Sequence, residues 1–305
     1  MKVNRNKKWV LYLSEIIKIS SKKILTIWSL LGFVWGISST LLDFSEYYLY
    51  YIIILLIPII LTIFLFIKAL LEIKKEIIKF NFKNGNNFFV MKNDYIKNMD
   101  IILSNSKSDD FYFAMGIDRS LDLSISTHKG ILYSVLNYLK NKYQLEIELI
   151  QNMINNAKEK QYPQKKKLNY GEILIVNIPI QDKIIHLLLV VNSEKKEEAI
   201  INNDIELVKG IDSRLIILKI FEKCQQINCE NLLIGAFGTN GLQFPYSVII
   251  TEIINDYINN QISEVNGFPK NLYLSIRNED MQRHNINHSD IVLYIHRILK
   301  FHEIR

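Results

Sequence analysis

Two long runs without a charged residue, close to the N-terminus, constrain this chain more than any other feature. The first covers residues 24–42 (ILTIWSLLGFVWGISSTLL) and the second covers residues 47–67 (YYLYYIIILLIPIILTIFLFI), with only the four residues DFSE between them. Each run is about as long as an α-helix that crosses ~30 Å of hydrocarbon. The pattern predicts a hairpin of two transmembrane helices.

The positive charges around these runs predict the orientation of the hairpin. Lysine and arginine lie only on the outer flanks, at Lys2, Arg5, Lys7, Lys8, Lys18, Lys22 and Lys23 before the first run and at Lys68, Lys74, Lys75 and Lys79 after the second. Basic flanks favour the cytoplasmic side, so both termini are expected in the cytoplasm. The net charge of +6 then reflects membrane orientation rather than binding to nucleic acid. A cleaved signal peptide is disfavoured, because a second apolar run follows at once.

The predicted organisation has four parts. Residues 1–23 form a basic interfacial segment, residues 24–67 form the hairpin, residues 68–84 form a stalk or linker, and residues 85–305 form one soluble domain. The helical pattern is expected to continue along the stalk to about Phe80. Gly32 and Gly36 form a small-xxx-small step, which allows close packing either within the hairpin or between chains. Because two helices cannot enclose a pore, a permeability function would need several chains.

The soluble part alternates strand-like and helix-like segments. Strands are predicted at residues 100–104, 173–180, 184–191, 232–236 and 271–276, and helices at residues 131–142, 145–160, 213–226, 246–261 and 290–299. Asn84-Gly85 between FNFK and NNFFVM adds a hairpin signal. The alternation predicts an α/β fold in which helices cover both faces of a mixed sheet, a three-layer α/β/α domain. Cys224 and Cys229 have no second cysteine pair nearby, so neither a metal site nor a disulfide is predicted.

Two loops after predicted strands are candidates for ligand binding. One is Ser124–Gly130 (SISTHKG), and the other is Gly235–Gly241 (GAFGTNG), which is followed by LQFP and a helix that Pro245 is expected to begin. In open α/β sheets, ligands bind beyond the carboxyl ends of the strands. Glycine-rich backbone at a helix N-terminus presents N–H groups that suit a diphosphate. A plain glycine-rich turn is the alternative for the second loop.

The run LLIGAFGTNGLQFPYSVIITEII resembles the second phosphate-binding loop of macro domains, and Gly171-Glu172 before a strand pair also fits that family. The resemblance covers roughly residues 85 to 305 and implies a macro-like fold. It implies that Asp94 binds the adenine amino group, although Asp94 as a simple turn residue is the alternative. The stretch DIILSNSKSDDFYFAMGIDRSL departs from hydrolytic macro domains, and no residue matches their catalytic asparagine. No catalytic residue is therefore predicted.

The order from ILSNSKSDDFYF to STHKG, joined to two N-terminal spans, resembles the membrane effector of type II Thoeris antiphage defence. That family implies an effector of the bacterial inner membrane that senses an ADP-ribose-derived signal of the histidine-ADP-ribose type. A partner TIR-domain enzyme would make the signal from NAD. Ligand binding would then cause oligomerisation and disruption of the lipid membrane, leading to abortive infection. No cofactor is expected besides this ligand.

The expected ligand-binding residues combine the two loops, the resemblance and the end of the last strand. Ser126 to Gly130 would present one helix N-terminus to the diphosphate, Gly238 to Gly241 would hold it from the other side, and Arg277 would meet a carboxylate or phosphate. The full set is Asp94, Ser104, Asn105, Ser126, Thr127, His128, Lys129, Gly130, Gly235, Phe237, Gly238, Thr239, Asn240, Gly241, Leu242, Phe244, Arg277 and Asn278. Solvated loops, and core packing of the two phenylalanines, are the alternatives.

Two other classes of function stay open. One is an enzyme, a membrane-tethered ADP-ribosyl hydrolase or deacylase, which the lack of a matched catalytic asparagine disfavours. The other is an anchored scaffold whose macro-like pocket is vestigial, which the glycine loops disfavour. Removal of the first 80 residues separates the classes, because only the effector would keep ligand binding and lose toxicity.

Overall fold

The computed structural model describes residues 25–35, 37, 47–74, 76–105, 110–123, 130–195, 207–209, 213–236, 245–262 and 269–303. The chain divides into two compact units. One contains residues 1–75 and 289–297, and the other, called here the α/β unit, contains residues 76–288 and 298–305.

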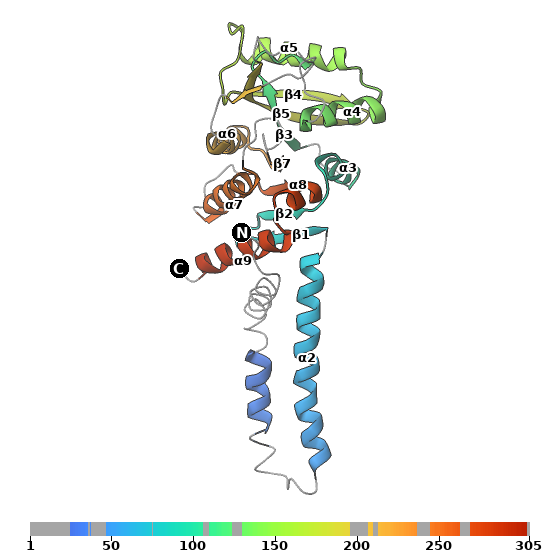
Figure 1. The fold of residues 1–305 in the computed structure, drawn as a ribbon, viewed down its shortest axis with the longest axis vertical. Helices are drawn as coiled ribbons and strands as arrows, with labels where there is room; N and C mark the ends of the chain where they lie inside the picture. The colour runs from blue at the N-terminus through green and yellow to red at the C-terminus, as the bar shows by residue number, and fades with distance from the viewer. Residues whose placement is uncertain are drawn as a thin grey trace. The chain divides into compact units, whose positions relative to one another are not determined.

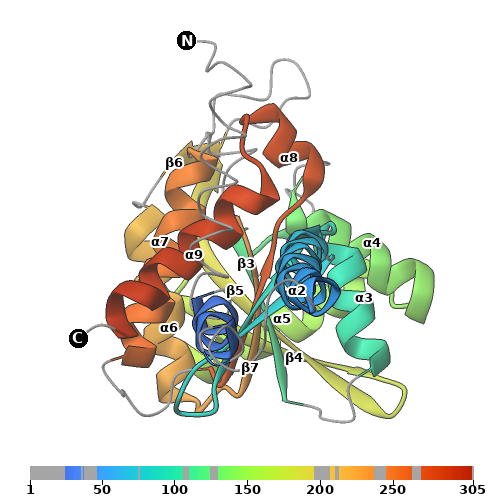
Figure 2. The same cartoon turned by 90° about the horizontal axis from the view of Figure 1, so that it is seen from below.

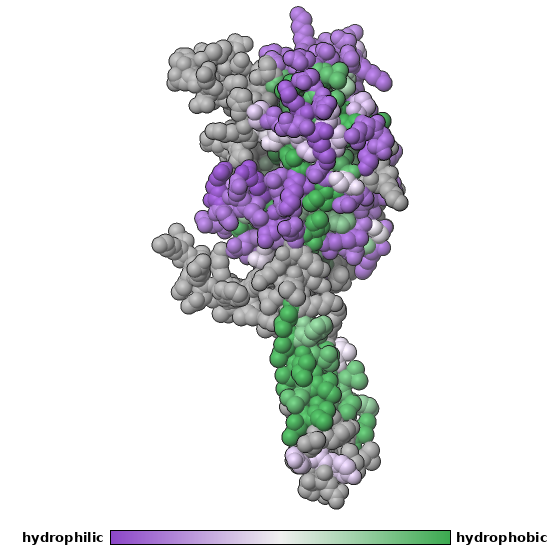
Figure 3. Space-filling view, turned by 90° about the vertical axis from the view of Figure 1, so that its right-hand side faces the viewer, coloured by the Kyte–Doolittle hydropathy of each residue, from purple (hydrophilic) through white to green (hydrophobic). Residues whose placement is uncertain are grey.

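The first unit contains helical residues 25–35 and helix α2 (Tyr48–Lys74). Residues 48–67 of α2 carry no charge, and Pro58 lies inside the helix. Its exposed apolar side chains are Ile52, Ile53, Leu56, Ile57, Ile60, Leu61, Ile63, Phe64 and Ile67. At 100° per residue these positions cover roughly half of the helix circumference. Figure 3 shows this apolar surface in green.

Within the part of the chain that the structure describes, no helix combines the length and the hydropathy of a membrane span. The hairpin of two membrane spans stays a prediction.

The α/β unit is built on one eight-stranded mixed sheet. The strands are β1 (Ile77–Asn81), β2 (Asn87–Met91), β3 (Phe111–Asp118), β4 (Ile173–Ile180), β5 (Lys183–Lys195), β6 (Leu207–Lys209), β7 (Asn231–Gly235) and β8 (Asn271–Ser275). Their order is β1-β2-β8-β7-β3-β5-β4, and β6 pairs with β5. The central strands β2, β8, β7, β3 and β5 run parallel, whereas β1, β4 and β6 pair antiparallel.

Helices lie on both faces of this sheet (Figures 1 and 2). On one face, α3 (Tyr95–Asn105), α4 (Ile131–Tyr143) and α5 (Ile147–Gln161) pack against the odd-numbered side chains of β3 and β5. On the other lie α6 (Ser213–Gln226) and α7 (Tyr246–Ile262), and α8 (Asn278–Arg283) follows β8. Helix α9 (His288–Glu303) ends the described chain. The predicted mixed α/β sheet with flanking helices is thus confirmed.

Most predicted elements of this unit are confirmed within a few residues, but two predictions are wrong and one central strand was missed. Residues 100–104 lie inside α3 instead of forming a strand, because buried side chains recur there at helical spacing, at Tyr95, Asn98, Met99, Ile102 and Leu103. The stalk helix ends at Lys74 rather than near Phe80, because residues 77–81 form β1 of the predicted β1–β2 hairpin. The central strand β3 was not predicted at all.

A chain of side-chain hydrogen bonds between three asparagines, called here the asparagine relay, crosses the amino ends of three parallel strands. Asn87, Asn271 and Asn231 are the first residues of β2, β8 and β7, and they are direct neighbours in register. The Nδ2 of Asn87 donates to Oδ1 of Asn271 at 2.7 Å, and the Nδ2 of Asn271 donates to Oδ1 of Asn231 at 2.8 Å. The Nδ2 of Asn231 ends the relay on the carbonyl oxygen of Asp110 at 3.0 Å. Because side chains alternate between faces, a one-residue slip of any strand would break it.

Candidate ligand site

The α/β unit contains a cavity of about 340 Å³ at the carboxyl ends of β7 and β8. It is lined by Asp94, Tyr95, Ile96, Gly130, Ile131, Ser134, Gly235, Ala236, Tyr246, Ser275, Arg277, Glu279 and Asp280. These residues come from the starts of α3, α4 and α7, from the ends of β7 and β8, and from α8. This is the edge of a parallel sheet at which ligands of open α/β proteins bind.

The first wall of the cavity is the start of α3. Asp94 is the N-cap of this helix, because its Oδ1 accepts a hydrogen bond from the backbone N–H of Lys97 at 2.8 Å. The cap uses one carboxylate oxygen of Asp94, and the residue also lines the cavity. Asp94 therefore serves the helix and stays available to a ligand.

The second wall combines the starts of α4 and α7. Gly130 is the N-cap of α4 in an extended conformation, and no side chain of the described residues caps the first turn. Tyr246 begins α7 at the start predicted for this helix, directly after Pro245, and both helices start on the cavity. An uncapped helix start offers unsatisfied N–H groups and the positive end of the helix dipole. The two helix starts therefore favour an anionic group.

Gly235, the last residue of β7, lies on the cavity in close contact with Tyr95 and Ile131. A Cβ built on Gly235 would lie 3.1 Å from Cδ2 of Tyr95 and 3.2 Å from Cδ1 of Ile131. Such distances are shorter than ordinary carbon contacts of 3.5–4.0 Å. The glycine therefore lets the Tyr95 ring approach the strand closely.

The charged side chains of the described lining are mostly acidic. Asp94, Glu279 and Asp280 face a single cation, Arg277, whose Nη2 is paired with Glu279. Tyr246 is buried and its ring stacks on His284, with ring centroids 5.2 Å apart. Burial, and then the charge of Asp280, raise the pKa of the Tyr246 hydroxyl, which therefore stays protonated. Among the described groups of the lining, the backbone N–H groups of the helix starts are therefore better suited to an anion than the side chains.

The buried side-chain amide of Asn98 connects the segment before α3 to the end of β8 beside the cavity. Asn98 of α3 is fully buried, and its Nδ2 donates to the carbonyl oxygen of Asn93 at 3.0 Å and to Oγ of Ser275 at 2.8 Å. Oγ of Ser275 in turn donates to the carbonyl oxygen of Asn93 at 3.2 Å. These bonds connect the loop that leads into α3 to the end of β8, so they fix Asp94 relative to β8.

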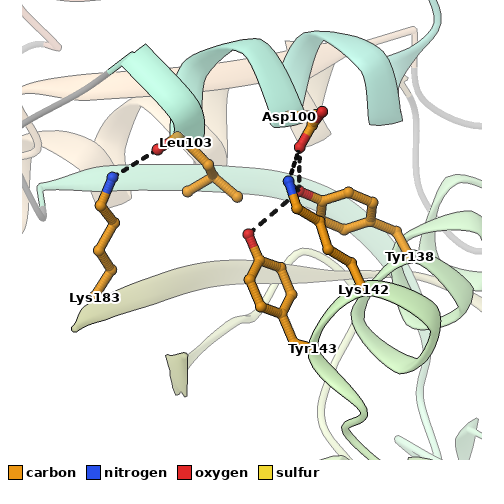
Figure 4. Close-up of polar contacts among 6 residues, drawn as sticks. All are labelled: Asp100, Leu103, Tyr138, Lys142, Tyr143 and Lys183. Atoms are coloured by element: carbon orange, nitrogen blue, oxygen red, sulfur yellow. Dashed lines mark hydrogen bonds and ion pairs between the residues drawn. The ribbon is translucent and has the colours of Figure 1, made fainter. Parts of the chain in front are cut away.

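A polar cluster joins α3 to α4 away from the cavity (Figure 4). The hydroxyl of Tyr138 donates to Oδ1 of Asp100 at 2.7 Å, and Nζ of Lys142 is paired with the same oxygen. Chiefly through this hydrogen bond from Lys142, the pKa of Asp100 is lowered from its usual value. Tyr143 completes the cluster, with its hydroxyl 3.4 Å from that of Tyr138. The cluster holds together the two helices whose starts line the cavity.

The structure brings some of the predicted ligand-binding residues together and separates others. Asp94, Gly130, Gly235 and Arg277 line the cavity. Ser104 and Asn105 are the last two residues of α3, and Asn278 begins α8; none of these three is in the lining. The other predicted ligand-binding residues lie outside the described residues: Ser126, Thr127, His128, Lys129, Phe237, Gly238, Thr239, Asn240, Gly241, Leu242 and Phe244.

Sequence reasoning missed Tyr95, Ser134, Tyr246 and Ser275 in the lining. Tyr95 and Tyr246 directly follow Asp94 and Pro245, so a search for the first residue of each helix after a strand would have found both. Ser134 lies one turn inside α4, and Ser275 is the last residue of β8. Among the described residues, no group of histidine, cysteine, aspartate and glutamate is arranged to hold a metal ion.

Comparisons with known proteins give only structural similarities. No family model and no curated protein matches the sequence. Among solved structures, the macrodomain of Oceanobacillus iheyensis with ADP matches with a TM-score of 0.45 and 11% identity, covering 75% of this chain and 98% of that one. The same macrodomain with MES bound gives 0.45 and 10%, covering 72% and 96%, and a mutant of it with ADPR gives 0.37 and 12%, covering 68% and 95%. Scores below 0.5 at this identity assign no function to the chain.

The fold and the cavity define the class of protein on their own. The α/β unit is a mixed-sheet domain with a cavity at the carboxyl ends of its parallel strands, bounded by three helix starts. Helix starts at such an edge offer backbone N–H groups that suit a small molecule with an anionic group.

Proposed function

We propose that this chain is a membrane-anchored receptor whose α/β unit is a macro-like domain that binds an ADP-ribose derivative. The observation that carries the proposal is a cavity lined by the start of α4, which no described side chain caps, and by the start of α7. The same chain contains the apolar helix α2. The two helix starts suit the diphosphate of such a ligand.

The cavity also has groups for the other parts of this ligand. Asp94 provides a carboxylate oxygen that can accept a hydrogen bond from the amino group of adenine. Asp280 and Glu279 place further acceptors on the cavity, which suits ribose hydroxyls or a cationic substituent. A substituent of the histidine type carries such donors.

The first unit supports a membrane location for the receptor. The apolar side chains of α2 are roughly 40–60% exposed over about half of the helix surface, and an exposed apolar face of this length marks a membrane or protein contact. The basic residues on both flanks of the two apolar runs favour a hairpin with both termini in the cytoplasm of a bacterial cell. A Cβ built on exposed Gly32 meets no atom of the described residues within 4 Å, which is compatible with contact to another chain.

The resemblance to type II Thoeris effectors extends this proposal to the role of the protein in antiphage defence. The signal is of the histidine-ADP-ribose type and is made from NAD by a TIR-domain enzyme. Binding drives oligomerisation of the chain and disruption of the inner membrane, and the infected cell dies before the phage is released.

The test is calorimetric titration of the full-length protein in lipid nanodiscs with ADP-ribose, histidine-ADP-ribose and NAD. Gly235→Val places a branched side chain where a single Cβ is already too close, so we expect it to abolish binding. Leu149→Ala changes an exposed residue of α5 outside the lining and serves as the matched control. Dye leakage from vesicles containing the protein, with and without ligand, tests the membrane function.

Each result separates the functions under consideration. Tight binding of one ADP-ribose derivative, unchanged ligand after incubation and ligand-dependent leakage support the receptor. Turnover of the ligand would instead identify an ADP-ribosyl hydrolase or deacylase. Absence of binding for all three compounds would refute the macro-like proposal.

A further inference from the structure

The cavity lies at the point where two neighbouring parallel strands separate. β3 and β7 pair only over Phe111–Phe113 and Asn231–Leu233, although β3 continues to Asp118 and β7 to Gly235. After the strands, the chain enters α4 on one face of the sheet and α7 on the other (Figure 2). Beyond Phe113 the two strands therefore share no registered pair.

Tyr95 bridges the two strands where their pairing ends. Its hydroxyl donates to the carbonyl oxygen of Ala114 in β3 at 3.0 Å and to that of Leu233 in β7 at 3.2 Å. Ala114 is the first residue of β3 beyond the last pair, and Leu233 is the last paired residue of β7. One buried hydroxyl thus replaces the hydrogen bonds of the ladder at this point.

The ring of the same tyrosine supports the cavity. Tyr95 is 6% exposed and lines the cavity, and its Cδ2 lies 3.1 Å from the position of a Cβ on Gly235. Burial raises the pKa of the Tyr95 hydroxyl well above its usual value, so it stays a hydrogen-bond donor over the whole physiological range. The hydroxyl fixes the ring, and the ring fixes the end of β7.

We propose that Tyr95 is a positioning residue for the ligand: its hydroxyl sets the separation of β3 and β7 beneath the cavity, so that ligand affinity depends on a group buried below the site. This inference rests on the proposed binding of an ADP-ribose derivative. It predicts a cavity floor that is already formed before the ligand arrives.

Tyr257 provides a matched control, because it is also a buried tyrosine that donates to backbone carbonyls. Its hydroxyl lies 2.9 Å from the carbonyl oxygen of Asn87 and 3.2 Å from those of Pro269 and Lys270, at the amino ends of the strands. Tyr257→Phe therefore removes comparable hydrogen bonds at the edge of the sheet opposite the cavity. A general loss of stability would affect both variants alike.

The experiment measures the affinity of the full-length protein for ADP-ribose and its amide hydrogen exchange. We expect Tyr95→Phe, which keeps the ring, to weaken ADP-ribose binding about tenfold or more, and Tyr257→Phe to change it less than about twofold. Exchange at residues 114–118 and 234–235 should rise in Tyr95→Phe alone. In the wild type, ADP-ribose should alter exchange at residues 234–235 only slightly, because the floor is already formed.

The outcomes distinguish this inference from the proposed function. If the wild type does not bind ADP-ribose, the proposed function fails and the inference falls with it. If the wild type binds and the two variants are weakened equally or not at all, only the role of Tyr95 is refuted. If Tyr95→Phe does not fold, the exchange of the wild type decides, and a large ligand-induced protection at residues 234–235 would overturn the inference.

Discussion

The contact between Gly235 and its neighbours leads to a quantitative prediction for Gly235→Ala. No positive φ constrains Gly235, so alanine can adopt its backbone conformation. By itself, the lower chain entropy of alanine should stabilise the strand by about 0.5–1 kcal/mol. The new Cβ, however, lies 3.1 Å from the Tyr95 ring and 3.2 Å from Ile131 Cδ1, and overpacking of this kind costs about 1–3 kcal/mol.

Tyr95 has little freedom to relieve this contact, because its hydroxyl is held by two carbonyl groups. Ile131 is partly buried and is the neighbour that can be shortened. The expected net destabilisation of Gly235→Ala is about 0.5–2 kcal/mol, which is a fall of a few degrees in Tm for a unit of this size. Ile131→Val removes Cδ1 and should cost up to about 1.5 kcal/mol alone.

The double variant Gly235→Ala/Ile131→Val should be more stable than the sum of the two single effects, because it removes one of the two close contacts. Thermal unfolding of the full-length protein and of the three variants measures this coupling. Gly32→Ala is the control, since an added Cβ there meets no described atom within 4 Å and should not lower Tm. A Tm for Gly235→Ala equal to that of the wild type, or purely additive effects in the cycle, would refute the reasoning.

Three further predictions concern other parts of the chain. Asp100 has a lowered pKa in the folded state, so its contribution to stability is present above its usual pKa of 3.8 and is lost as the pH falls through the lower folded value. Asp100→Asn should therefore lower the free energy of unfolding at pH 7 by less than about 1 kcal/mol, since the pair with Lys142 is partly exposed. The variant should also lose less Tm than the wild type between pH 5 and 2. An acid profile of Tm equal to that of the wild type would contradict this. Asn98→Ala removes the two hydrogen bonds that Nδ2 donates, to the carbonyl oxygen of Asn93 and to Oγ of Ser275, and should cost about 1–3 kcal/mol in denaturant unfolding. A loss near zero would show that these bonds do not stabilise the α/β unit. Ile60→Lys places a charge on the exposed face of α2, which costs about 2–3 kcal/mol inside a membrane. The fraction of protein that stays membrane-bound after alkaline extraction should therefore fall. An unchanged fraction would show that this face does not contact lipid.

Local patterns were sufficient to predict much of the α/β unit. The strands around residues 173–191 and the helix at residues 213–226 have clear periodicity and clear turn residues between them. The run at residues 100–104 failed because five apolar and polar residues fit a strand as well as one helical turn. The N-cap Asp94 was a usable signal for α3, but it was assigned to adenine binding instead.

The candidate ligand site could be predicted only in part, because local sequence patterns do not encode the order of the strands in the sheet. Asp94, Gly130 and Gly235 stand at junctions between strands and helices, and such junctions are visible in a sequence. The role of Tyr95 is not visible there, because it depends on the separation of β3 and β7. That separation is a property of sheet order, and no local pattern around Tyr95 encodes it.

The asparagine relay at the amino ends of the strands has a consequence for how this protein ages. All three amides have the same orientation. In each one the nitrogen donates to the next residue of the relay, and the last acceptor is the carbonyl oxygen of Asp110. If slow hydrolysis turned Asn271 into aspartate, its donor would be lost and its new oxygen would face Oδ1 of Asn231, acceptor against acceptor. Deamidation of Asn271 would therefore remove its hydrogen bond to Asn231 and weaken the pairing of β7 with β8 at their first residues.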